Sequence, residues 1–391
     1  MHVVSRIPDR ELDELMKESA RIKSIRSFTR EDIPRVADML QRLLLPDAPS
    51  RRMLSTSELP EYLERVFFDN PWYDESLPSL VFEAPNGKLI GFLALAPRRM
   101  LFQDRPVRVV ISLHFMVEPE SRSSLAAIQL LKSLFSGYQD LVFTDGAGLP
   151  GRKLWEAVGG VTSHLYSQRW MRILRPARQA VSTLNQHGNT GGSKFFSYTT
   201  QALSPLVDLV DVTAARMLPR YFSKVTSAYS EAELDVETVL TYLPQFSKGL
   251  ALRPIYDAPS LRWLFNQAAQ MKLHGEFKKI QLRDDRGEVA GWYLYYLKRD
   301  GLSSVIQVVA RKNSEGAVID HLFDHARRGG AVALSGRLEP RYMQELADKG
   351  CFFNRVGCLM LMQSNNTEIL NAIYRGDAFL TPLEGEWCVT P

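Results

Sequence analysis

The sequence predicts an α/β (α+β) protein with two mixed, mostly antiparallel sheets, each flanked by helices. Segments with apolar residues at helical spacing alternate along the chain with short apolar runs of strand length. Turns such as Asn86-Gly87 and Asp285-Arg286-Gly287 join neighbouring strands and favour antiparallel hairpins. This succession of elements occurs twice in outline, and we therefore expect one sheet in each half of the chain.

The length of the chain, 391 residues, indicates two domains, because single hydrophobic cores stop growing well below this size. Residues 175–197 have the composition of a linker, and the apolar spacing over 202–221 predicts a connecting helix. We expect four parts: an N-terminal helical extension (1–23), a first domain (24–174), a linker with its helix (175–227), and a second domain with a C-terminal tail (228–391).

The composition is that of an ordinary globular protein, with 45% hydrophobic and 24% charged residues. No apolar run reaches the roughly 18 residues of a membrane span, and the first residues lack a signal-peptide core, so we expect a cytoplasmic protein. The net charge of +4 is modest, and the paired arginines are too scattered for a nucleic-acid stripe. We expect free thiols at the three cysteines and no metal, because neither cysteines nor histidines show metal-site spacing.

The first domain is predicted to begin with a strand at 25–28 and two helices. Thr29 is a helix N-cap with an acid three residues later, and an apolar stripe runs from Ile33 to Leu44. A second helical pattern covers 58–68. Three strands should follow, at 79–83, 89–95 and 107–117.

The stretch from His114 to Lys132 reads as strand, turn and helix. Pro119 ends the apolar strand because proline donates no backbone hydrogen bond, and small polar residues then lead into a helix with apolar residues at helical spacing. The free N–H groups and the positive dipole end of such a helix form an anion site where small residues let a phosphate approach.

This stretch resembles the acyl-CoA pyrophosphate loop of the GNAT acyltransferase superfamily. In that family an aliphatic strand end is followed by x-Pro-x-x and then by Gln/Arg-x-x-Gly-x-Gly/Ala, which opens a helix. Val117, Pro119, Arg122 and Ala127 fall on matching positions, whereas Leu125 stands where the family prefers glycine. The resemblance implies acetyl-CoA or another acyl-CoA as donor. Its implied binding groups are the strand backbone and the loop, namely Met116, Val117, Arg122, Ser123, Ser124, Leu125, Ala126 and Ala127.

The remaining elements of the first half also resemble the GNAT order. A strand is expected at 140–145, a helix at 152–158 and a closing strand at 166–173. In the family the helix commonly carries a tyrosine that protonates the leaving thiolate. Trp155 holds the matching position here and cannot serve as an acid.

The second half is predicted to repeat this architecture, so the resemblance implies two tandem GNAT-like domains. Residues 256–264 also resemble a segment of GNAT proteins from bacterial polysaccharide clusters and of Fem-type aminoacyl transferases. The loop at 311–317 lacks proline, and Glu315 would repel a diphosphate. We therefore expect donor chemistry in the first domain and a structural or acceptor-binding second domain.

Two residues are candidates for proton transfer. His114 precedes the strand end by three residues and titrates near the required pH, although a lone histidine on an apolar strand is more often a packed core residue. Tyr166 could replace the missing tyrosine, although tyrosines in strands usually pack. We expect Glu118 to be solvated, and Asp145 could orient an acceptor or cap a turn.

The sequence thus favours an enzyme, a GNAT-type N-acyltransferase that moves an acetyl or longer acyl group from acyl-CoA to an amine or hydroxyl acceptor. A sugar precursor is one candidate acceptor. Two alternatives stay open: a Fem-like transferase that takes its aminoacyl group from tRNA, and a catalytically degenerate scaffold that binds a partner.

Overall fold

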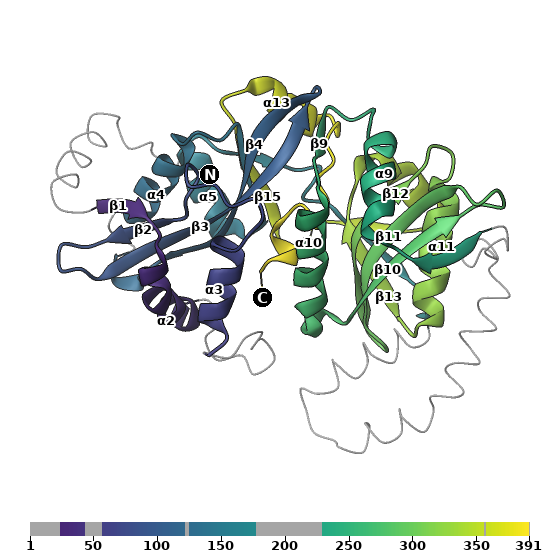
Figure 1. Ribbon diagram of the computed structural model, residues 1–391, viewed down its shortest axis with the longest axis horizontal. Coiled ribbons are helices and arrows are strands. Elements are labelled where there is room, and N and C mark those ends of the chain that lie inside the picture. The colour runs from purple at the N-terminus through teal and green to yellow at the C-terminus, as the bar shows by residue number, and fades with distance from the viewer. Residues whose placement is uncertain (1–23, 44–56, 122–124, 177–228, 356, 391) are drawn as a thin grey trace, which may run out of the picture. The chain divides into compact units, whose positions relative to one another are not determined.

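The computed structural model describes residues 24–43, 57–121, 125–176, 229–355 and 357–390 (Figure 1). The expected N-terminal helix and the connecting helix at 202–221 lie outside the described residues. The chain divides into two compact units. The first contains Met1–Ser163, Cys358–Asn371 and Val389–Pro391, and the second contains His164–Gly357 and Ala372–Cys388.

The first unit is built on a mixed sheet with the strand order β1-β2-β3-β4-β5-β15-β6. All neighbours in this order are antiparallel except β4 and β5, which are parallel. Its strands are β1 (Ser24–Ser27), β2 (Leu80–Glu83), β3 (Leu89–Phe102), β4 (Arg105–Val117), β5 (Leu141–Ala147), β6 (Val161–Ser163) and β15 (Leu359–Gln363).

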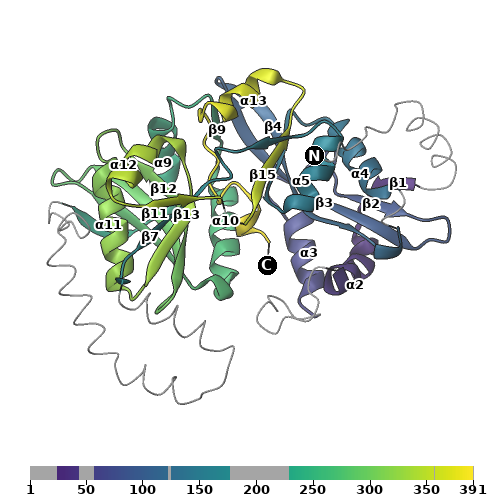
Figure 2. The ribbon, with the colours of Figure 1, turned by 180° about the vertical axis from the view of Figure 1, so that it is seen from behind.

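Helices cover both faces of this sheet, as Figures 1 and 2 show. On one face lie α2 (Ile33–Leu43) and α3 (Leu59–Phe67), and on the other lie α4 (Ala126–Phe135) and α5 (Leu149–Ala157). Because side chains alternate along β4, Phe115 and Val117 pack with the core under α4, whereas His114 contacts aromatic rings of α3. The short 3-10 helices η1 (Arg30–Asp32) and η2 (Pro119–Ser121) precede α2 and α4.

The second unit has a sheet with the order β14-β7-β13-β12-β11-β10-β8, in which only β12 and β13 are parallel. Its strands are β7 (Arg169–Ile173), β8 (Ser230–Glu233), β10 (Glu276–Arg283), β11 (Val289–Leu297), β12 (Leu302–Ala310), β13 (Ala333–Arg337) and β14 (Phe352–Asn354). The described α-helices of this unit are α9 (Val236–Phe246), α10 (Ala258–Gln270), α11 (Glu315–Arg328) and α12 (Met343–Asp348), and its 3-10 helices are η3 (Lys272–His274), η4 (Pro340–Tyr342) and η5 (Glu386–Cys388). The residues of α13 (Thr367–Tyr374) are divided between the two units.

Two strands, β7 and β15, pair in a different sheet from the one that we expected. The strand at 166–173 was expected to close the first domain, but β7 pairs with β13 and β14 in the second sheet. Conversely, β15 pairs with β5 and β6 in the first sheet. The N-terminal segment of the first unit therefore runs to Ser163 and not to residue 174, and Cys358–Asn371 and Val389–Pro391 complete the unit. A short alternating strand encodes which of its faces is buried but not which sheet supplies its hydrogen-bond partner, so local pattern could not reveal this exchange.

The structure also describes the cysteines, the lengths of the helices and the grouping of possible metal ligands. None of the three cysteines forms a disulfide, as we expected, and Cys351 and Cys388 are buried. Among the described residues no helix has the length and apolar character needed to cross a membrane. In the same part of the chain, no group of three or more His, Cys, Asp or Glu side chains is arranged to hold a metal ion.

Candidate functional site

A separation of two parallel strands defines the candidate site in the first unit. β4 and β5 pair at Val109–Leu141, Val110–Val142 and Ile111–Phe143, and the described residues show no further pair between them. Both strands continue beyond these pairs, β4 to Val117 and β5 to Ala147. The other edge of β5 pairs with β15. The last residues of β4 thus present a backbone edge that β5 does not fill.

A β-bulge lies at this point of β4. Phe92 of β3 pairs with Met116, but Ala94 pairs with Leu113, so His114 and Phe115 together oppose a single residue of β3. His114 has a φ of +38°, which is uncommon for a residue other than glycine. Backbone strain of this kind persists only where surrounding contacts impose it, and it often marks a functional position.

The direction of the backbone amides follows from one hydrogen bond. The N–H of Glu118 donates to the carbonyl of Ile90 at 2.9 Å, so this residue faces β3. Since successive residues of a strand direct their polar groups to opposite edges, Met116 also faces β3 and Val117 faces the side where β5 has parted from β4. Of the two amides expected to bind a donor carbonyl, that of Val117 faces the gap, and that of Met116 is turned toward the ladder with β3.

The loop after β4 is described only in part. Arg122, Ser123 and Ser124 lie outside the described residues. Leu125 precedes α4 and is half-buried, Ala126 packs in the core, and Ala127 is half-buried in the first helical turn. That first turn contains no acidic residue, so its dipole is not opposed by a carboxylate of the helix itself.

Gly91 of β3 allows α4 to lie close to the sheet. A Cβ atom at this position would be 2.9 Å from Cδ1 of Leu130, which is closer than real Cβ contacts, and 3.2 Å from Cβ of Phe82, which is tight. The absence of a side chain at this position therefore leaves room for Leu130 of α4 against β3.

His114 is enclosed by aromatic residues of α3. Nε2 of His114 lies 2.5 Å from the hydroxyl of the buried Tyr62, and its ring makes edge contacts with the rings of Tyr62 and Phe67. Burial lowers the pKa of His114 to about 4, because the charged imidazolium would lose its hydration. The imidazole is neutral near pH 7 and is a weaker base there than its ordinary pKa would make it.

Glu118 is buried, contrary to our expectation that water solvates it. Its carboxylate accepts a hydrogen bond at 2.9 Å from Nη2 of Arg42, which also binds Asp38 through Nε at 2.8 Å. These hydrogen bonds, with that to Glu118 the stronger, raise the pKa of Arg42. The ion pair fastens the end of β4 to α2. A sequence pattern could not reveal it, because the two partners are far apart in the chain.

Tyr166 is not available for the acid role that we considered. It lies in the second unit, in a turn before β7, and its buried hydroxyl donates to the carbonyl of Ala378 at 2.6 Å. Burial raises the pKa of this phenol. The hydroxyl anchors the C-terminal segment of the second unit.

Trp155 takes a structural role on α5. Its Nε1 donates to the carbonyl of Met362 in β15 at 3.1 Å, and its ring packs at 5.0 Å from that of Phe135. Gly160 makes room for the indole, because a Cβ at 160 would come within 1.8 Å of the ring. Asp145 is buried at the end of β5.

The sequence analysis did not identify Tyr62 or Arg42 as parts of the site. Tyr62 sits among Leu59, Leu63 and Val66, and this apolar spacing gave it the pattern of an ordinary core residue. The only available signal was a tyrosine within an otherwise aliphatic stripe, since a buried hydroxyl needs a partner.

Comparison with known proteins supports the fold. No protein-family model matches the sequence, and no curated protein is similar to it. Among solved structures, one similar protein is described as a probable N-acyltransferase of unknown function from Enterococcus faecalis V583, with 10% identity over 88% of this chain and 72% of that chain, at a TM-score of 0.55. A GCN5-related N-acetyltransferase from Anabaena variabilis ATCC 29413 is 12% identical over 88% of this chain and 73% of its own, at a TM-score of 0.51. The chain therefore has the GNAT fold.

Proposed function

We propose that this protein is an acyltransferase that binds an acyl-CoA at the end of β4 in the first unit. The observation that carries the proposal is the orientation of the Val117 amide. This amide faces the gap that begins where β5 stops pairing with β4. A thioester carbonyl in this gap would accept a hydrogen bond from that amide. Such a bond strengthens as negative charge develops on the carbonyl oxygen during attack.

The diphosphate of the donor would bind beside this carbonyl position, where the chain enters α4. Support comes from the sequence of the loop, in which Arg122 carries a positive charge and Ser123 and Ser124 are small. It also comes from the described first turn with Leu125, Ala126 and Ala127, which contains no acidic side chain. A guanidinium and free helix N–H groups are both suited to bind phosphate oxygens.

The acyl transfer itself requires little from side chains. The nitrogen or oxygen of the acceptor forms a bond to the carbonyl carbon, the C–S bond breaks, and the thiolate takes a proton from water. The acceptor proton passes to water, which replaces the proton that the thiolate has taken. His114 and its partner Tyr62 lie beside the bulge, and we assign to the neutral imidazole a role as hydrogen-bond partner of the acceptor.

Calorimetric titration of the full chain tests the proposal. Acetyl-CoA and acyl-CoAs of increasing chain length are titrated in turn, and we expect saturable binding of at least one. Ala127→Glu should weaken this binding at least about tenfold by placing a carboxylate next to the diphosphate. Ser133→Glu, which adds the same charge farther along α4, is the matched control and should bind normally. A wild-type chain that binds none of these donors would refute the proposal.

A further inference from the structure

The two units share one local arrangement at the end of their central strands. In the second unit the N–H of Arg311 donates to the carbonyl of Ala290 at 2.8 Å, as that of Glu118 does to Ile90 in the first. Gly291 pairs with Ala310, as Gly91 pairs with Val117. Ala310 is thus the counterpart of Val117.

The strands also separate in the same way. β12 and β13 pair in parallel from Leu302–Ala333 to Val305–Gly336, after which the described residues show no further pair, and β12 runs on to Ala310. Successive residues of a strand direct their polar groups to opposite edges, as described for β4. The amide of Ala310 therefore faces away from β11, toward the edge of β12 with which β13 no longer pairs. The second unit therefore contains a counterpart of the gap in which we place the donor carbonyl.

In the second unit this strand edge is occupied by its own side chains. The N–H of Ala310 donates to the hydroxyl oxygen of Tyr342 at 3.0 Å, and Nη2 of Arg341 donates to the carbonyl of Val308 at 3.2 Å. Both side chains come from η4, and Arg341 is held by Glu339 at 2.7 Å and lies 4.6 Å from the ring of Tyr342. Two polar groups of the free edge of β12 are thereby satisfied.

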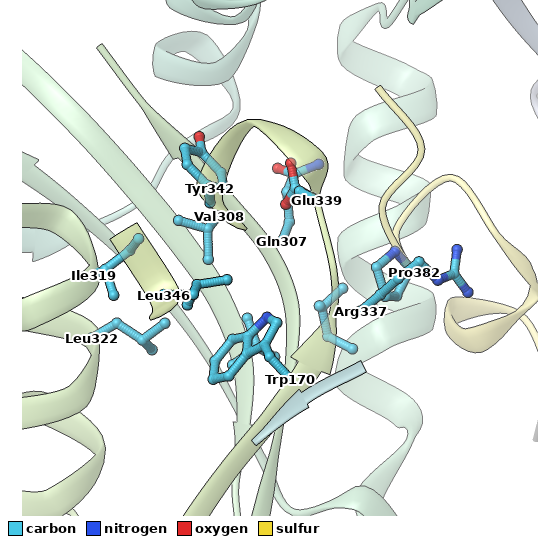
Figure 3. Close-up of a pocket in the computed structure, with 12 residues that line it drawn as sticks. Trp170, Gln307, Val308, Ile319, Leu322, Arg337, Glu339, Tyr342, Leu346 and Pro382 are labelled. Carbon is cyan, nitrogen blue, oxygen red and sulfur yellow. The ribbon is translucent and has the colours of Figure 1, made fainter. Parts of the chain in front are cut away.

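Little space remains beside Tyr342. Side chains from β12, α11, α12 and β7 converge here (Figure 3), including Trp170, Leu322 and Leu346. The cavity that they leave has a volume of about 10 Å³, which is room for about one water molecule. An acyl chain or a pantetheine arm cannot enter without displacing buried side chains.

The helix that follows is also unsuited to a diphosphate. Glu315 lies in the first turn of α11, and a Cβ at Gly316 would be 3.0 Å from a carboxylate oxygen of Glu345 and 3.7 Å from Nζ of Lys349, whose charge is paired with Asp320 at 2.7 Å. Two carboxylates near the helix N-terminus oppose an anion there. The carboxylates, the small cavity and the hydrogen bond of Tyr342 therefore all argue against an acyl-CoA site in the second unit.

We propose that Tyr342 closes the second cleft by placing its hydroxyl oxygen where a donor carbonyl would bind, so that the chain takes a single acyl-CoA, in its first unit. This inference deepens the proposed function. Its claim of one acyl-CoA per chain rests on that function. The contact between Tyr342 and Ala310 can be tested without any donor, which separates the two hypotheses.

Two measurements on the full chain test the inference. Calorimetry should give one acyl-CoA per chain, both for the wild type and for Tyr342→Phe, whereas Ala127→Glu should weaken this binding at least about tenfold. A stoichiometry of two, or a donor affinity that is unchanged in Ala127→Glu and changes with Tyr342→Phe, would overturn the inference. Amide hydrogen exchange should show the Ala310 amide exchanging about tenfold faster in Tyr342→Phe, because phenylalanine keeps the packing and removes the acceptor.

Equal exchange at Ala310 in wild type and variant would show that Tyr342 does not occupy this amide, and would refute the closure. If the wild type binds no acyl-CoA but exchange at Ala310 responds to Tyr342→Phe, the proposed function fails while the closure by Tyr342 stands. Thermal unfolding of Tyr342→Phe provides the check that the variant is folded.

Discussion

The hydroxyl of Tyr62 and Nε2 of His114 form a 2.5 Å hydrogen bond that joins α3 to the bulge of β4. Both side chains are enclosed by aromatic rings, and His114 holds a backbone conformation that few residues adopt. The bond therefore fixes the one irregular position of the strand whose end faces the candidate donor site.

Tyr62→Phe should destabilise the protein by about 1–2 kcal/mol. The substitution removes the hydroxyl and leaves a buried imidazole nitrogen without its partner, while the ring packing is kept. Urea unfolding measures the change. Tyr73→Phe is the control, because Tyr73 is 44% exposed, and its effect should stay below about 0.5 kcal/mol. Equal effects of the two substitutions would mean that the bond between Tyr62 and His114 does not stabilise the fold.

His114 should make stability depend on pH in the acidic range. Its folded-state pKa is about 4, below the ordinary value of 6.5, so between these values the unfolded chain binds a proton that the folded chain does not. The free energy of unfolding therefore falls as the pH drops from about 6.5 to 4. The full loss from this group is roughly 3 kcal/mol.

A comparison with His114→Asn isolates this effect. Asparagine tolerates positive φ and does not titrate. Burial also lowers the pKa of His274, His321 and His325, so both proteins lose stability in acid and only the difference between their curves reports on His114. Curves that run parallel from pH 7 to pH 4 would contradict the assignment.

The ion pair of Arg42 and Glu118 should respond unequally to removal of its two members. The side chain of Glu118 is 4% exposed and that of Arg42 is 47% exposed. Arg42→Met leaves a buried carboxylate without its cation and should cost on the order of 3 kcal/mol. Glu118→Gln leaves a guanidinium that water can solvate and should cost about 1 kcal/mol.

Chemical denaturation of the two variants measures this difference. Lys88→Met is the control, because Lys88 forms an exposed ion pair with Glu120 at 3.4 Å that should contribute less than about 0.5 kcal/mol. If Glu118→Gln proved the more damaging change, burial of the carboxylate would not be the main factor.

Gly91→Ala should weaken donor binding and stability together. The added methyl group would meet Cδ1 of Leu130 at 2.9 Å and Cβ of Phe82 at 3.2 Å, so that the Leu130 side chain or α4 must shift, at a cost of about 1–3 kcal/mol. Calorimetry and thermal unfolding measure the two effects. Gly249→Ala is the control, because a Cβ there meets no atom within 4 Å. Unchanged donor affinity in a destabilised Gly91→Ala protein would show that the position of α4 does not govern the site.

Much of the fold could be predicted because it depends on local patterns. The proline at 119 and the apolar run before it mark the end of β4, and the residues from Ala126 onward form the helix that their spacing predicts. Asn86-Gly87 closes the hairpin of β2 and β3. The pattern could not show that β7 and β15 pair with the sheet of the opposite half, because strand pairing depends on hydrogen bonds between distant segments.

The site was harder to predict for the same reason. His114 reads as a histidine on an apolar strand, and only its burial against the rings of Tyr62 and Phe67 shows why its pKa is low. Glu118 follows a strand in a polar sequence, and only the packing of α2 shows that it is buried and paired with Arg42.

The sequence by itself determined the fold class, the strand–loop–helix at His114 to Lys132 and the poor match of the loop at 311–317, since each follows from residues close together in the chain. Only the tertiary structure decided that the amide of Val117 faces the edge of β4 with which β5 no longer pairs, while its counterpart at Ala310 is bound by Tyr342. The physical reason is that the direction of a backbone amide depends on the register of its neighbouring strand, and its partner comes from a segment 32 residues away.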